Sequence, residues 1–95
     1  MELHDAVFES MKVRWRDGSA AITVRTSEGR RTFVIRDTSE VRLTRRAPWG
    51  PSEHINTLKR VETEAGFRFE FELQSGDSLV VEGTSMNETT SQQDR

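Results

Sequence analysis

Strict alternation of apolar and polar residues over positions 67–74 is the feature that most restricts the fold of this chain. The apolar positions are Phe67, Phe69, Phe71 and Leu73, and the residues between them are charged or amide side chains. A strand places successive side chains on opposite faces, whereas a helix would spread these apolar residues around its whole surface. The segment therefore predicts a β-strand with one apolar face and one polar face.

Short turns separate further alternating segments. Asp17-Gly18 is a strong hairpin signal because both residues tolerate positive φ. A two-residue turn there sets Trp15 opposite Ala20 and Val13 opposite Ile22, all on one apolar face. Turns at residues 28–29 and 37–39 continue that face over four strands within residues 7–46, with Ile22 opposite Ile35 and Ile35 opposite Val41.

The second half predicts another meander, over residues 54–83. A three-residue loop at positions 75–77 sets Phe71 opposite Val81. Leu58 departs from the parity of Ile55 and Val61, which indicates a bulge or a slipped register. Residues 47–53 hold both prolines of the chain and form the expected crossover loop between the two sheets.

The fold expected is one all-β domain over residues 1–83, with about seven antiparallel strands forming a small sandwich or partly open barrel. A short N-terminal helix is a second interpretation of the start, because Leu3, Ala6, Val7 and Met11 also fit a helical stripe. Residues 84–95 are polar, with Met86 as their apolar anchor, so we expect a disordered tail.

The amino-acid composition excludes several kinds of functional site. The chain has 95 residues and no cysteine, which excludes a disulfide framework and a cysteine nucleophile and fits a reducing compartment. No apolar run approaches the ~20 residues of a membrane span, and the start is not typical of a signal peptide. We expect a soluble, cytoplasmic, non-catalytic protein without a membrane contact, a metal or a cofactor, since no motif specifies a reaction.

Charge is distributed unevenly along the chain, although the net charge is only −2. The expected register collects seven cations and no carboxylate on the outward face of the first sheet, where repulsion between like charges is relieved by counterions, by acids from a loop or by an anionic partner. An ordinary solvated sheet face is the structural alternative. These cations are Lys12, Arg14, Arg16, Arg25, Arg36, Arg42 and Arg46. The candidate polyanion-binding residues among them are Lys12, Arg14, Arg16, Arg25, Arg42 and Arg46.

The crossover loop supplies a second candidate surface. Trp49 is flanked by two prolines and a glycine, so a rigid loop would present its ring, and Ser52 and His54 follow it closely. We take Trp49, Ser52 and His54 as candidate loop contacts. Sealing of the open end of the sandwich by Trp49 is the structural alternative.

These features predict a small binding or interaction domain whose ligand or protein partner the sequence does not specify. The first alternative is binding of RNA or single-stranded DNA through the basic sheet face. The second is a self-associating structural subunit, in which the basic face meets a mixed to mildly acidic face on the second sheet of another copy.

Overall fold

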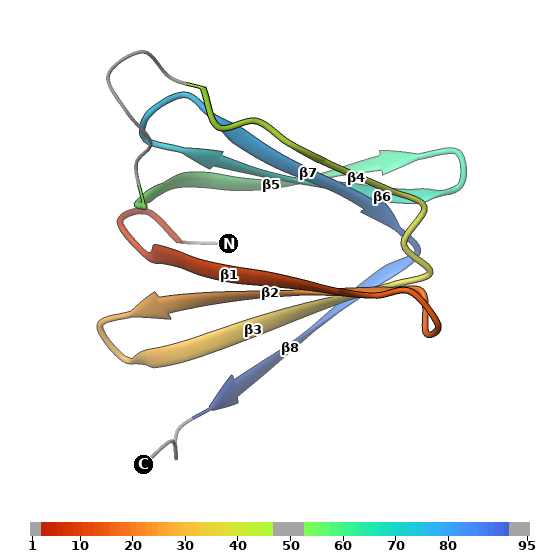
Figure 1. The fold of residues 1–95 in the computed structure, drawn as a ribbon, viewed down its shortest axis with the longest axis horizontal. Coiled ribbons are helices and arrows are strands. Elements are labelled where there is room, and N and C mark those ends of the chain that lie inside the picture. Colours follow the sequence, from red (N-terminus) through yellow and green to blue (C-terminus); the bar gives the residue numbers. More distant parts are fainter. Residues whose placement is uncertain (1–2, 47–52, 92–95) are drawn as a thin grey trace.

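Eight antiparallel strands in two open four-stranded sheets make up the protein, according to a computed structural model that describes residues 3–46 and 53–91, with side chains as far as residue 88. The first sheet, sheet A, has the order β1 (Val7–Arg14), β2 (Ser19–Thr26), β3 (Gly29–Arg36) and β8 (Ser85–Ser91). The second, sheet B, has the order β4 (Glu40–Leu43), β7 (Ser78–Gly83), β6 (Gly66–Leu73) and β5 (Ile55–Thr63). The two sheets form the layers of a sandwich (Figure 1).

The predicted all-β class is confirmed, but the division of strands between the sheets was wrong. β4 pairs with β7 in sheet B instead of following β3 in sheet A, so Val41 lies opposite Val81 and not Ile35. The place beside β3 is taken by β8, within the segment predicted to be a disordered tail. The described residues contain eight strands and no helix, which also contradicts the suggested N-terminal helix. None of them forms a helix suited to crossing a bilayer.

Backbone hydrogen bonds explain why the two errors occur together. β3 continues into β4 and β7 continues into β8, and the two connections pass from one sheet to the other side by side (Figure 1). The amide of Thr84 donates to the Arg36 carbonyl at 2.9 Å, and the amide of Ser39 donates to the Glu82 carbonyl at 2.8 Å. β8 is thus ordered by main-chain pairing with β3, which does not require an alternating apolar sequence.

Gly83 lies at this crossing and is buried. A Cβ atom there would lie 2.5 Å from the Arg36 carbonyl oxygen and 2.6 Å from Cγ2 of Ile35. Both distances are too short for non-bonded contacts, and the first involves backbone that cannot rotate away. The crossing between the sheets therefore depends on the absence of a side chain at position 83.

The hairpin turns differ from those predicted, although the faces do not. Val13 lies opposite Ala20 and not Ile22, Ile22 lies opposite Phe33 and not Ile35, and Phe71 lies opposite Leu79 and not Val81. Each partner differs by two positions, and because side chains alternate, a shift of two keeps these residues on their predicted faces, although Val13 is 48% exposed. Trp15 is the exception, since the wider turn over residues 15–18 removes it from the ladder with Ala20.

The core lies between the two sheets. Ile22 and Phe33 of sheet A and Phe69 and Phe71 of sheet B are almost completely buried. The rings of Phe33 and Phe71 meet edge to face across the layers, with centroids 6.2 Å apart and an interplanar angle of 63°. The expected irregularity in β5 is confirmed as a break in register between Ile55 and Thr57, which turns Leu58 into the core.

Candidate polyanion-binding face

Sheet A turns five cationic side chains outward, away from the core. The odd positions 33 and 35 of β3 and the even positions 20, 22 and 24 of β2 are buried, so the alternate positions face solvent. We call the cations on this side the basic face: Lys12, Arg14, Arg25, Arg30 and Arg36. All five residues are exposed.

One part of the basic face is a shallow hollow of about 500 Å³. Lys12, Arg14 and Arg36 line it together with Asp17 of the β1–β2 turn and with uncharged residues of the three strands. Across the ladder, Lys12 lies opposite Ala21, Arg14 opposite Ser19 and Arg36 opposite Ser85. The cations of the hollow thus have no acidic cross-strand neighbour.

Ion pairing in the hollow is weak. The Arg14 guanidinium lies 3.8 Å from Asp17 of the following turn, and both side chains are more than half exposed. Among the described side chains, no carboxylate pairs with Lys12 or Arg36. An exposed pair such as Arg14 with Asp17 contributes little to stability, so these cations are available to an external anion.

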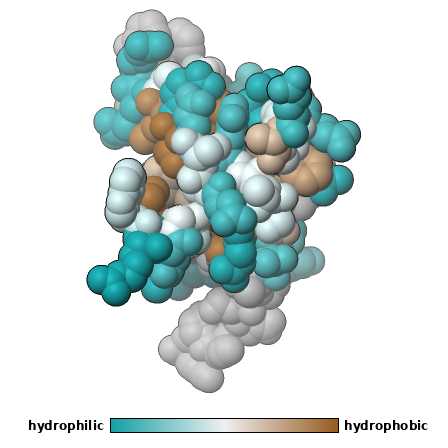
Figure 2. All heavy atoms as spheres, turned by 90° about the vertical axis from the view of Figure 1, so that its right-hand side faces the viewer, coloured by the Kyte–Doolittle hydropathy of each residue, from teal (hydrophilic) through white to brown (hydrophobic). Residues whose placement is uncertain are grey.

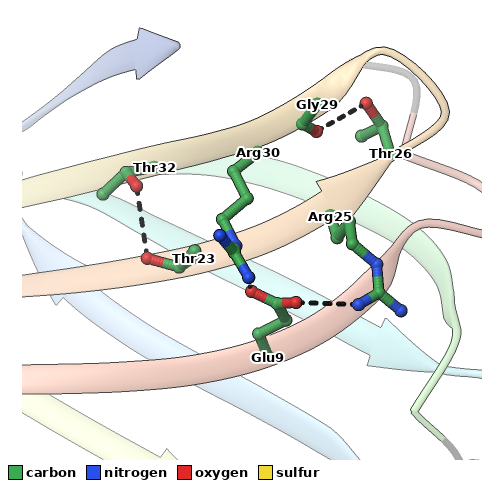
Figure 3. Close-up of polar contacts among 7 residues, drawn as sticks. All are labelled: Glu9, Thr23, Arg25, Thr26, Gly29, Arg30 and Thr32. Atoms are coloured by element: carbon green, nitrogen blue, oxygen red, sulfur yellow. Dashed lines mark hydrogen bonds and ion pairs between the residues drawn. The ribbon is translucent and has the colours of Figure 1, made fainter. Parts of the chain in front are cut away.

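The other part of the basic face holds a carboxylate. Arg25 and Arg30 lie directly opposite each other on β2 and β3, and the Glu9 side chain reaches over to both (Figure 3). Its two oxygens accept hydrogen bonds of 3.0 Å from Arg25 and 2.8 Å from Arg30. The hydrogen bond from Arg30, together with the charges of both guanidinium groups, lowers the pKa of Glu9 below its ordinary value.

The expected absence of carboxylates from this face was therefore wrong. β1 shifts register between Phe8 and Ser10, and Glu9 lies in that bulge. A bulge changes where a side chain is directed, so simple alternation along β1 does not place Glu9 beside Arg25. The basic face retains an excess of cations, with Glu9 and the Asp17 of the hollow against five positive side chains.

The six predicted polyanion-binding residues do not form one cluster. Lys12, Arg14 and Arg25 lie on the basic face, and Arg16 lies in the β1–β2 turn. Arg42 faces outward from sheet B, because β4 belongs to that sheet. Arg46 follows β4, and its amide donates to the Asp77 carboxylate at 2.9 Å.

Two cations of the basic face were not among those six. Arg36 was placed on the outward face but left out of the binding set, and Arg30 was omitted from both. Alternation along β3 indicates both, because positions 30, 32, 34 and 36 share one side. Glu9 has no comparable signal in the sequence.

The loop candidates lie elsewhere. Trp49 and Ser52 are outside the described residues. His54 is exposed and forms an isolated antiparallel bridge with Val7, and its carbonyl accepts a hydrogen bond of 2.8 Å from the Gln74 amide. The backbone of His54 therefore connects the start of β5 to β1 and to the end of β6.

In comparisons with known proteins, no family model, curated protein or solved structure matches this chain.

Proposed function

We propose that this protein is a non-catalytic domain that binds an anionic polymer on the basic face of sheet A. The observation that carries the proposal is the hollow lined by Lys12, Arg14 and Arg36, whose cross-strand neighbours are small and uncharged. Like charges held on one rigid sheet repel one another, and a bound polyanion relieves that repulsion.

The distribution of charge supports a polymer over a single small anion. The hollow cations lie at one part of the sheet and Arg25 lies with Arg30 at another, so the positive charge extends along the strands. A chain of phosphates or sulfates can contact several of these cations at once. Each contact releases condensed counterions, which makes such binding strongly dependent on salt.

The proposal is tested with matched double variants. Lys12→Gln/Arg36→Gln removes one lysine and one arginine from the hollow, and Lys59→Gln/Arg42→Gln removes the same charges from the outer face of sheet B. The probes are a single-stranded oligonucleotide, heparin and long-chain polyphosphate, titrated over a range of salt concentrations.

We expect the sheet A double variant to bind more weakly and to reduce the slope of log K against log salt by about 0.7 to 0.9 for each cation removed. The sheet B double variant should retain the wild-type slope. Equal losses in the two variants, or no binding of any probe at low salt, would contradict the proposal.

Self-association through faces of opposite charge stays a prediction. The outer face of sheet B carries Lys59 and Arg42 among its carboxylates, so its charge is mixed and gives the basic face only a weak electrostatic partner.

A further inference from the structure

Trp15 is the most exposed large hydrophobic residue of the described chain. Its relative exposure is 92%, against 48% for both Val13 and Leu43. It lies in the β1–β2 turn, which is defined by a hydrogen bond of 2.9 Å from the Gly18 amide to the Arg14 carbonyl. Burial of this ring against a ligand would be favourable, and the apolar residues Val13 and Val41 beside it extend the exposed patch.

A second hollow, of about 320 Å³, lies beside this ring and is lined by Val13, Trp15 and Val41 among others. This hollow is more apolar than the one on the basic face, and Arg14 lines both. Figure 2 shows the end of the molecule that lies to the right in Figure 1. Hydrophobic atoms reach the surface there between hydrophilic ones. A cationic surface and an exposed aromatic ring are thus joined at the end of one hairpin.

We propose that Trp15 stacks against an unpaired base of the bound polymer, which makes the polymer a single-stranded nucleic acid. This inference rests on the proposed function and identifies the class of ligand. Cations that contact phosphates and an aromatic ring that stacks on a base are the two components of sequence-tolerant single-strand binding. Arg14 and Arg16 flank Trp15 in the chain, and Arg14 lines the hollow beside the ring.

The position of Trp15 favours a single strand over a duplex. Lys12 faces outward from β1 and lines the hollow of the basic face, whereas Trp15 lies in the turn after β1 and lines the second hollow with Val13 and Val41. A ligand that contacts both must bend around the end of the hairpin. A single strand bends readily, whereas duplex DNA is stiff over about 150 base pairs.

The surroundings of Trp15 also disfavour a second copy of this chain as its partner. A symmetric dimer through this turn would bring Arg14 and Arg16 of both copies into one small interface, with Asp17 and Glu40 as the carboxylates nearby. Like charges placed opposite each other oppose association.

The experiment uses the full chain with Trp49→Phe, so that Trp15 is its only tryptophan. Trp15→Ser removes the ring, and Trp15→Phe keeps an aromatic face as the matched control. The probes are an oligothymidylate and an abasic phosphodiester of the same length, which carries the same charge without bases.

We expect Trp15→Ser to weaken oligothymidylate binding about 5- to 150-fold, the range for loss of one stacked base. Binding of the abasic chain should stay unchanged, and Trp15→Phe should lose much less than Trp15→Ser. Fluorescence of Trp15 should be quenched by oligothymidylate and not by the abasic chain.

Failure of this inference is distinguishable from failure of the proposed function. Unchanged oligothymidylate binding in Trp15→Ser, with both probes still weakened by Lys12→Gln/Arg36→Gln, would overturn the role of Trp15 and leave the basic face supported. Binding of neither probe would overturn the inference, and it would overturn the proposed function as well if heparin and polyphosphate also failed to bind. Trp15 fluorescence that changes with protein concentration alone would show self-association at the ring and would overturn the inference.

Discussion

The outer faces of sheets A and B are alike in shape and different in charge. Each has a shallow hollow, of about 500 Å³ on sheet A and about 540 Å³ on sheet B. In sheet B, Lys59 lies directly opposite Glu70, and Glu72 lines the same hollow. In sheet A, Lys12 lies opposite Ala21.

Twisted sheets are concave on parts of their surface whatever their sequence, so a hollow by itself does not mark a binding site. The cross-strand neighbours decide whether the charges of a hollow are already paired. Glu70 forms an ion pair with Arg68 at 2.7 Å, and Glu72 accepts hydrogen bonds from Asn56 and Thr57, so two carboxylates are held within the hollow of sheet B. The hollow of sheet A holds Asp17, which lies 3.8 Å from Arg14.

The largest expected effect is a loss of stability from a substitution at the crossing between the two sheets. Gly83→Val places a branched side chain where even a Cβ would lie 2.5 Å from the Arg36 carbonyl oxygen. We expect a loss of at least about 3 kcal/mol in the free energy of unfolding, measured by urea denaturation, and loss of binding as the protein unfolds.

Gly18→Ala is the control for that variant. Gly18 has a φ of +67°, but no atom lies within 4 Å of the position of its Cβ. Backbone strain alone should cost about 1 kcal/mol. A Gly83→Val protein as stable as Gly18→Ala would show that the crossing does not require glycine.

Charge reversal in the hollow of sheet B should make its outer face resemble the basic face. Glu70→Lys/Glu72→Lys gives sheet B a hollow with unpaired cations and should create a second polyanion site. Isothermal titration should show the stoichiometry rise from one to two, with overall affinity for heparin about tenfold higher, which corresponds to about 1.4 kcal/mol. An unchanged stoichiometry would mean that charge is not what distinguishes the two faces.

A smaller effect is expected from acid. Hydrogen bonds from Arg30 and Arg31 lower the pKa of Glu9 and of Glu88, respectively. Each pair therefore stabilises the fold fully above the ordinary carboxyl pKa, and the contribution is lost as pH falls through the lowered folded value.

Urea denaturation should show that the free energy of unfolding is about 1 kcal/mol lower near pH 3 than at neutral pH because of these two pairs. The effect is small because both pairs are partly exposed. Glu9→Gln/Glu88→Gln should reduce the difference between the two pH values. If the double variant keeps the full difference, other carboxylates account for the acid sensitivity.

The smallest effect concerns the carboxylate within the basic face. Glu9→Gln removes the negative charge between Arg25 and Arg30 and should raise polyanion affinity about two- to fivefold while lowering stability slightly. Fluorescence anisotropy with an oligonucleotide measures the first change, and urea denaturation measures the second. Weaker binding by Glu9→Gln would indicate that Glu9 positions the two guanidinium groups for the ligand.

Alternation along the chain determined which side chains face the core. Ile22, Phe33 and Phe71 are buried as predicted, and Lys12 and Arg25 face outward as predicted. The cross-strand partners predicted for these residues were wrong. The side that a residue faces depends on a local period of two, which survives the wider or displaced turns because each moved the register by two positions.

Tertiary structure alone decided the strand partners and the composition of the candidate site. β4 belongs to sheet B and β8 to sheet A. Main-chain hydrogen bonds to the carbonyls of Arg36 and Glu82 hold the two connections side by side where they pass between the sheets. The bulge in β1 brings Glu9 to the basic face, and the wide β1–β2 turn exposes Trp15. These outcomes depend on pairing between residues far apart in the chain, which a local pattern of apolar and polar residues does not encode.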